Sequence, residues 1–343
     1  MSPETTKFKH LVEDTQNILI TSHASPDPDA VASTLLLGGA LKLNFPNKRI
    51  EMILEEEPDS LSFLSGYNQI KFSPLDEATA ELKPELFILV DVANFSRASR
   101  QSGEKLREYI KSSQAKVAII DHHEPEGRDE SDLYINSMKS ASVQEIYELI
   151  FSQLDLKKPS DSAQVAMTGL YGDTGGFTYI DASNADALEL AAELVREGAT
   201  VETLKYQLNQ FSEDQIQVVS ELAKNLSHFK DFTYSYLEDG FVDTWQKSGK
   251  PQAAMQRANK IFIDDYIRNI DGRDKGFIAY RNPLEGEDMY SVSFRAARGS
   301  QDVSKLARTL GGGGHKSSAG GKVEAKTVQE ALSKIQEAIT QSA

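Results

Sequence analysis

The chain has 343 residues, of which 39% are hydrophobic, so it is long and apolar enough to form one large or two smaller folded domains and is not a disordered chain. It contains no cysteine, which excludes disulfides, thiolate metal sites and cysteine nucleophiles and leaves histidine, carboxylate and hydroxyl groups to build any site. The formal net charge of −15 argues against long duplex DNA or RNA as a partner, because such binding depends on many Lys and Arg contacts to phosphate.

The first half of the chain alternates strand-like and helix-like segments. Short runs rich in Ile, Leu and Val predict strands over residues 17–22, 49–54, 86–91 and 116–121. Helix-like stretches lie between them, at 29–42 and 97–111. This alternation predicts an α/β fold, in which a mostly parallel sheet is covered by helices on both faces.

The second half is first helical and then returns to strands. We expect helices over residues 140–154, 161–171, 184–197 and 200–228. Strand signals follow at 232–237, 276–280, 290–295 and 321–324, separated by helices near 253–268, 302–310 and 326–341. The pattern therefore predicts a first domain over 1–198, a helical linker over 199–230 and a smaller α/β domain over 231–343.

Three of the predicted strands end at polar residues, namely His23, Asp91 and Asp121. In open α/β sheets, ligands bind at the carboxyl ends of the strands, so these residues are candidates for one shared site. Asp27 and Asp29 follow His23 in a turn before a predicted helix, where both carboxylates can reach one metal ion. Asp29 also stands where a helix N-cap is expected, but that structural role explains only one residue of the His-x-x-x-Asp-x-Asp pattern.

Two further motifs extend this set. Asp121-His122-His123 follows a predicted strand, and two histidines beside a carboxylate at a strand end have few structural explanations. Asp91 alone is explained equally well as a turn residue, and Asp173 as part of a helix-ending turn. Together, however, these residues combine imidazole with at least four carboxylates, a mixture that suits Mn²⁺, Mg²⁺, Co²⁺ or Fe²⁺. Two such ions can activate water and stabilise the leaving oxygen of a phosphoryl group.

The C-terminal part contains a glycine run, Gly311 to Gly314, which follows a basic predicted helix and precedes His315. Such a run is also compatible with a flexible linker or a helix C-terminus. We favour phosphate binding, because glycine lets bare backbone N–H groups approach an anion and Arg295 adds a fork-shaped donor. Residues 291–321 hold five basic residues against Asp302, a net charge of +4; the five are Arg295, Arg298, Lys305, Arg308 and Lys316.

Taken together, the motifs described above resemble, in order, the four motifs of the Asp-His-His (DHH) phosphoesterases. The segment from Gly311 to Gly320 resembles the signature of the C-terminal domain that accompanies many of them. The closest resemblance is to the nanoRNases, also described as oligoribonuclease and pAp-phosphatase proteins. Pro28 stands where the family often has Gly, and Ser318 where it often has Ala, but neither departure removes a ligand.

The resemblance implies a role for each candidate residue. It implies one metal ion held by His23, Asp27 and Asp91. It implies a second ion held by Asp29, Asp91, His122 and Asp173, so that Asp91 bridges the two. Asp121 is expected to orient an imidazole from behind the site, and His123 to contact the scissile phosphate or protonate the leaving oxygen. The substrate-binding residues implied in the C-terminal domain are Ser293, Arg295, Gly312, Gly313, Gly314 and His315.

The function implied is that of a two-metal phosphoesterase that converts short RNA, dinucleotides or pAp to mononucleotides. Mn²⁺ is the first expected ion, with Mg²⁺ or Co²⁺ as alternatives. The resemblance makes residues 1–198 the catalytic domain and 231–343 the substrate-binding domain. Other substrates of the superfamily stay open, including linear or cyclic dinucleotide messengers, pyrophosphate and polyphosphate, as does a homodimer. A non-catalytic nucleotide-sensing module is a further alternative, although no expected ligand is missing.

The sequence also predicts where the protein resides. Its longest apolar runs, such as Leu86 to Val90, are too short to span a bilayer. The N-terminal residues lack the apolar stretch of a signal peptide. We therefore expect a cytoplasmic protein without a membrane partner, and the absence of cysteine suits that reducing compartment.

Overall fold

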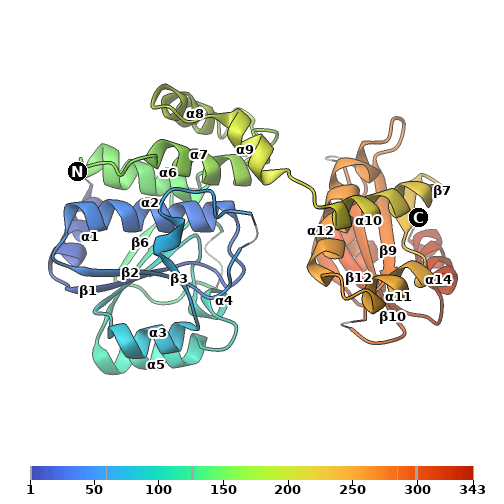
Figure 1. Ribbon diagram of the computed structural model, residues 1–343, viewed down its shortest axis with the longest axis horizontal. Helices are drawn as coiled ribbons and strands as arrows, with labels where there is room; N and C mark the ends of the chain where they lie inside the picture. The colour runs from blue at the N-terminus through green and yellow to red at the C-terminus, as the bar shows by residue number, and fades with distance from the viewer. Residues whose placement is uncertain (1, 59, 125–126, 284, 298–299, 343) are drawn as a thin grey trace. The chain divides into compact units, whose positions relative to one another are not determined.

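The computed structural model describes residues 2–58, 60–124, 127–283, 285–297 and 300–342. Arg298, counted above among the basic residues, lies outside these ranges. The chain divides into two compact units, Met1–Gln210 and Phe211–Ala343, which are described separately (Figure 1). Among the described residues, no helix is both long and apolar enough to cross a membrane.

Six described strands of the N-terminal unit form one sheet in the order β3-β2-β1-β4-β5-β6, and the pairings among them are all parallel. The strands are β1 Asn17–Thr21, β2 Arg49–Leu54, β3 Ile70–Phe72, β4 Leu86–Val90, β5 Lys116–Ile120 and β6 Leu133–Ile135. The order runs outward from the β1–β4 pair in both directions. Such a reversal opens a crevice at the carboxyl ends of the two strands, where α/β proteins bind ligands.

Helices cover both faces of this sheet, as Figure 1 shows: α2, α6 and α7 lie on one side, and α3 and α5 on the other. The helices are α1 Pro3–Glu13, α2 Pro28–Asn44, α3 Leu75–Leu82, α4 Phe95–Ala98, α5 Gly103–Ser113, α6 Ser142–Tyr147, α7 Ser162–Asp173, α8 Asp186–Arg196 and α9 Val201–Leu208. A short 3₁₀-helix, Tyr67–Gln69, precedes β3, and a π-helix, Glu148–Gln153, continues α6. The expected α/β fold is confirmed.

The C-terminal unit contains a mixed sheet in the order β11-β12-β10-β9-β8-β7. Its strands are β7 Ser227–Phe229, β8 Phe232–Tyr236, β9 Lys275–Arg281, β10 Met289–Ala296, β11 Gly313–His315 and β12 Ser318–Glu324. Its helices are α10 Glu213–Lys224, α11 Asp239–Lys247, α12 Gln252–Asp265, the 3₁₀-helix Ile267–Asn269, α13 Val303–Thr309 and α14 Val328–Gln341. Along β10, buried and half-buried residues alternate. Val292 and Phe294 therefore face one apolar core, while Ser293 and Arg295 face the other side.

Some expected helices are divided differently. The helix expected over 97–111 is two helices, α4 and α5. The long helix expected over 200–228 is interrupted after Leu208, because Ser212 begins a new helix with a capping box to Gln215. That segment ends in strand β7, so its parts belong to both units. Helix α11 was not expected, and Trp245 within it is buried in an apolar cluster.

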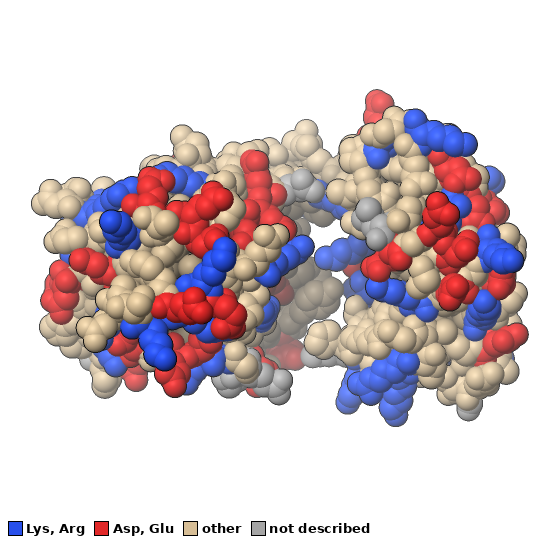
Figure 2. All heavy atoms as spheres, turned by 90° about the horizontal axis from the view of Figure 1, so that it is seen from below, with Lys and Arg blue, Asp and Glu red and all other residues tan. Residues whose placement is uncertain are grey.

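The two units differ in charge. Residues 211–343 contain as many Lys and Arg as Asp and Glu, so the formal charge of −15 resides in residues 1–210. Over the faces seen in Figure 2, acidic and basic side chains are interspersed. The N-terminal unit is therefore the acidic part of the protein and the C-terminal unit its electrically balanced part.

Candidate active site

The carboxyl ends of neighbouring strands bring the candidate residues together. His23 lies just beyond β1, Asp91 directly after β4 and Asp121 directly after β5. Asp91 has a φ of 58°, in the left-handed region that a non-glycine residue seldom adopts. Its N–H donates to the carbonyl of Ile120 at 2.9 Å, which holds this turn against β5. Backbone strain of this kind is concentrated at functional sites.

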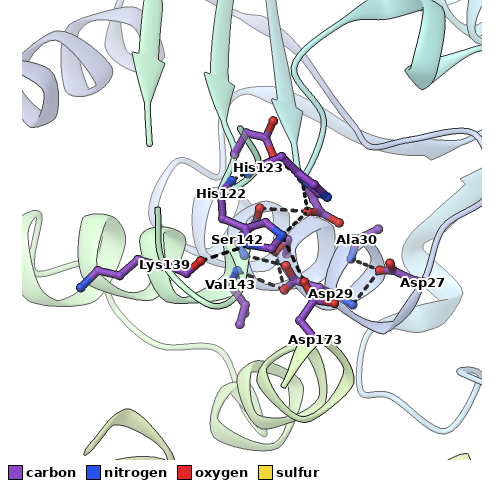
Figure 3. Close-up of polar contacts among 12 residues, drawn as sticks. Asp27, Asp29, Ala30, His122, His123, Lys139, Ser142, Val143 and Asp173 are labelled. Atoms are coloured by element: carbon purple, nitrogen blue, oxygen red, sulfur yellow. Dashed lines mark hydrogen bonds and ion pairs between the residues drawn. The ribbon is translucent and has the colours of Figure 1, made fainter. Parts of the chain in front are cut away.

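Asp91 lies between two imidazoles and is almost completely buried. Its Oδ2 is 3.4 Å from Nε2 of His23, and its Oδ1 is 3.3 Å from Nε2 of His122. Nε2 of His122 is also 3.1 Å from Oδ2 of Asp173, which projects from the end of α7 (Figure 3). Each carboxylate oxygen of Asp91 therefore faces a different imidazole.

Asp91 belongs to three groups of possible metal ligands. Within each group, the donor atoms lie within 4.8 Å of one another. Their members are His23, Asp27 and Asp91; Asp29, Asp91, His122 and Asp173; and Asp91, His122 and His123. The first two groups contain the same residues as the two ligand sets implied by the resemblance. The six expected ligands are thus brought together in one place, while their binding of metal stays a prediction.

The two aspartates that follow His23 have different surroundings from those expected. Asp27, not Asp29, is the N-cap of α2, because its Oδ1 accepts from the N–H groups of Asp29 and Ala30, each at 3.0 Å. Its other oxygen lies 3.7 Å from Nε2 of His23. Asp29 is fully buried and accepts from the N–H groups of Ser142 at 2.6 Å and Val143 at 3.1 Å. The start of α6 therefore fixes the Asp29 carboxylate (Figure 3).

Ser142 is a site residue that the sequence analysis missed. Besides its N–H bond to Asp29, it donates its hydroxyl to Oδ1 of Asp91 at 3.0 Å. Ser142 thus orients two of the expected ligands, Asp29 through its backbone N–H and Asp91 through its hydroxyl. Its only sequence signal was its place near the start of a predicted helix, since both partners lie far away in the chain.

The two adjacent histidines are held by different acceptors. Nδ1 of His122 lies 3.2 Å from the carbonyl oxygen of Lys139. If Nδ1–H donates there, Nε2 is left facing the carboxylates, as in metal-binding histidines. Nδ1 of His123 is 2.8 Å from Oδ1 of Asp121, which also accepts from the N–H groups of both histidines. The side chain of His123 is 40% exposed against 13% for His122, so His123 is the more accessible to a substrate.

The charges of the cluster shift its pKa values. Burial lowers the pKa of His122, but the nearby carboxylates of Asp173 and Asp91 outweigh burial and raise that pKa to about 11. Burial likewise lowers the pKa of His23, which bonds with Asp27 and Asp91 raise to about 10. Without a metal ion, both imidazoles are therefore in their cationic form at neutral pH, and their positive charge offsets the negative charge of the carboxylates.

Two carboxylates respond in opposite directions. Burial, followed by the charges of Asp91 and Asp173, raises the pKa of Asp29 well above its usual range. Burial also raises the pKa of Asp91, but the nearby imidazoles of His122 and His23 outweigh burial and hold that pKa well below its usual range. Asp91 is therefore the member of the cluster whose negative charge is best stabilised.

The donor atoms fit a divalent cation. Among the described residues, Oδ2 of Asp91 and Nε2 of His122 are buried atoms that make no hydrogen bond of good geometry. Both nevertheless face oppositely charged groups at 3.1–3.4 Å. Buried polar atoms are rarely left in this state, and divalent cations bound by the two donor groups would satisfy them. The mixture of imidazole and carboxylate suits the divalent ions expected from the sequence.

The expected substrate-binding residues of the C-terminal unit lie on β10 and on or just before β11, the two strands that flank β12. Arg295 on β10 pairs with Ser318 on β12, which pairs with His315 on β11. In the next row that points to the same face, Ser293 pairs with Gly320, which pairs with Gly313. These candidates are therefore brought together, on the side of the sheet opposite α14.

Part of the glycine run is extended strand and not a flexible linker. Gly313 and Gly314 belong to strand β11. A Cβ atom at Gly312 would lie 1.9 Å from the carbonyl oxygen of Gly320, so glycine is needed there for the close approach of two strands. Arg295 also has a partner that was not expected, since its Nε donates to Oδ1 of Asp264 at 2.6 Å. That bond fixes the guanidinium, and its partner, on α12, could not be inferred from sequence spacing.

Comparisons with known proteins agree with this arrangement. Residues 17–170 match the model of the DHH family, N-terminal domain, and residues 240–341 match that of the DHHA1 domain. The bifunctional oligoribonuclease and PAP phosphatase NrnA of Bacillus subtilis is 28% identical over 308 residues, which are 89% of each chain. A probable protein of the same name from Streptococcus mutans is 31% identical over 57% of each chain.

A solved structure shows the same fold. An exopolyphosphatase-related protein from Bacteroides fragilis superimposes with a TM-score of 0.77 at 21% identity, over 97% of this chain and 95% of that one. The exonuclease RecJ, solved with manganese bound, gives a TM-score of 0.52 at 16% identity, over 99% and 94% of the two chains. At these identities the likeness is one of fold.

Replacing Asp91 by Asn should greatly reduce the binding of divalent metal, because both donor groups lose the charge that they share. Asn accepts the left-handed backbone of this position, so the fold should be retained. Bound Mn²⁺ is measured by elemental analysis after gel filtration, with thermal unfolding as a check on folding. Asp155→Asn is the matched control, since Asp155 is an exposed aspartate with a φ of 51°. Full metal content in Asp91→Asn would contradict the shared role.

Metal binding should release protons. The pKa values of about 10 for His23 and about 11 for His122 lie above neutral pH, and an imidazole must lose its proton to bind a metal ion. At pH 7.5 we therefore expect Mn²⁺ binding to release protons and its apparent affinity to rise with pH. Calorimetric titration in buffers of different ionisation enthalpy measures this release. A binding heat that is the same in all buffers would contradict it.

Proposed function

The chain belongs to the DHH family of phosphoesterases, and on that premise we propose that it hydrolyses short oligoribonucleotides, including dinucleotides, and pAp to mononucleotides. The relatives named as oligoribonuclease and PAP phosphatase support these substrates. The observation that carries the proposal is the position of Asp91, whose two oxygens face two separate groups of donors. That arrangement is the one that a shared ligand of two ions requires.

The residues proposed to hold the metal ions are those of the two groups that share Asp91. His23, Asp27 and Asp91 would hold one ion, and Asp29, Asp91, His122 and Asp173 the other. Mn²⁺ is proposed first, with Mg²⁺ or Co²⁺ as alternatives. When bound, such ions supply a nucleophilic water at neutral pH and neutralise charge on the phosphoryl oxygens.

His123 is proposed to act on the substrate itself. His123 is the more exposed of the two histidines, and its Nδ1 is hydrogen-bonded to Oδ1 of Asp121. The contact with buried Asp121 fixes the ring and leaves Nε2 available to contact the phosphate or protonate the leaving oxygen. Asp121 is proposed as the residue that positions this ring, since its Oδ1 is already occupied by His123 and two backbone N–H groups.

The C-terminal unit is proposed to hold the nucleotide through the row Arg295, Ser318 and His315 and the neighbouring row Ser293, Gly320 and Gly313. Asp264 binds Nε of Arg295 and thereby orients the fork of Nη atoms. His315 and the glycines of β11 are exposed. A small anionic ligand could therefore reach both the side chains and the backbone of this strand.

His123→Ala should lower kcat on a diribonucleotide by about 10²–10⁴-fold while the protein still binds Mn²⁺, because a general acid contributes to rate and not to metal binding. His122→Ala should instead lose bound metal. A panel with Mn²⁺ tests the substrate class: pAp, diribonucleotides, five-residue RNA, cyclic dinucleotides and pyrophosphate. Exclusive turnover of pyrophosphate, or the reverse metal pattern in the two variants, would overturn the assignment.

Arg295→Ala should raise KM for a diribonucleotide by about 10- to 150-fold, the loss expected for a hydrogen bond to a charged group. Its turnover of bis-p-nitrophenyl phosphate, which makes few contacts beyond the phosphate, should fall less. Lys334→Ala is the matched control, because it removes a cation from α14 on the covered side of the same sheet. Equal losses on both substrates in folded Arg295→Ala protein would count against this role.

A further inference from the structure

An exposed tyrosine follows helix α7, whose last residue, Asp173, is one of the expected metal ligands. Tyr179 follows α7 and is 56% exposed. Its ring packs against Gly175, because a Cβ atom placed there would be only 2.3 Å from ring carbon Cε2. Gly175 is two residues beyond Asp173, so their Cα atoms are at most about 7.6 Å apart. The ring therefore packs on the turn that directly follows one of the expected metal ligands.

The turn that carries Tyr179 is held in one conformation. The N–H of Tyr179 donates to the carbonyl of Thr174 at 3.0 Å, which closes the turn. Gly175, Gly176 and Phe177 all have positive φ, at 58°, 65° and 67°. A positive φ is strained for Phe177, which is not glycine. Its ring packs edge-on against Tyr171 on α7, at 5.8 Å between ring centres, and this contact offsets the backbone strain. One aromatic ring thus anchors the turn, and the other is displayed to solvent.

A fixed, exposed aromatic ring next to a phosphate-binding site is the arrangement that proteins use to stack an unpaired base. We infer that Tyr179 is a stacking platform for the nucleobase of the nucleotide whose phosphate occupies the candidate active site. This inference rests on the proposed function and deepens it, since it gives the N-terminal unit a contact with the base in addition to those with phosphate. It assigns a preference for nucleotides over phosphate esters that lack a base.

The chain provides a matched control. Tyr206, on α9 of the same unit, is a second exposed tyrosine, at 68%. It is not part of the turn that follows Asp173. The stacking role depends on the ring and not on the hydroxyl group, so Tyr179→Phe should retain it, whereas Tyr179→Ala should not.

The test measures binding, with two small ligands that differ only in the base. Calorimetry of the Mn²⁺-loaded protein compares AMP with ribose 5-phosphate, and metal content is determined in each sample. We expect wild-type protein, Tyr179→Phe and Tyr206→Ala to bind AMP about 5- to 150-fold more tightly than ribose 5-phosphate, the range known for stacking of one base. In Tyr179→Ala, most of this preference should be lost while ribose 5-phosphate binds as before.

Three results would overturn the inference: no preference for AMP in the wild-type protein, an undiminished preference in Tyr179→Ala, or an equal loss of both ligands in that variant. Failure of the proposed function is a separate result. It would be recorded as an absence of oligonucleotide and pAp turnover, whereas the comparison of AMP with ribose 5-phosphate does not depend on turnover.

Discussion

Asp29, Asp91 and Asp173 place three carboxylates in one group of donor atoms, and their mutual repulsion has to be offset for the N-terminal unit to fold. The N–H groups at the start of α6 stabilise Asp29, and the two imidazoles stabilise Asp91. These contacts explain why α6 begins where it does and why glycine occupies position 169. A Cβ atom at Gly169 would lie 2.6 Å from Oδ1 of Asp29. The carboxylate charges that destabilise the fold by mutual repulsion are also the charges that attract a divalent cation.

The parallel sheet and its helices place most of the donor groups at or just beyond the ends of regular elements. Its strand order reverses between β1 and β4, and the residues just beyond these two strands, His23 and Asp91, face each other. Asp121 follows the next strand, β5, and α2 and α7 supply the remaining carboxylates from their ends. Rigid elements thus set most of the donor positions, and packing of the apolar strands fixes the distances between them. The second unit presents its polar residues on a sheet in the same way.

Much of this arrangement could be predicted because the signals are local. An apolar run that ends at Asp91 or Asp121 indicates both a strand and the edge at which its last residue lies. The position of Asp173 was less clear, since it closes α7 itself and does not belong to a turn after the helix. The roles of Ser142 and Asp264 could not be inferred from the local sequence, because each acts on a residue far away in the chain. The cap of α2 was assigned to Asp29 because both aspartates stand at suitable positions, and only backbone geometry distinguishes them.

The unequal charge of the two units has a consequence for how the protein responds to ionic strength. Proteins that bind nucleic acid through basic surfaces lose affinity as salt is added, because counterions return to the phosphates. Here the net charge of −15 belongs to the unit with the candidate active site, so a polyanion is repelled over most of that surface and attracted only near the metal-binding groups. Added salt screens the long-range repulsion more than the short contacts. If the proposed substrates are correct, moderate ionic strength should therefore weaken the repulsion of longer RNA by the acidic unit.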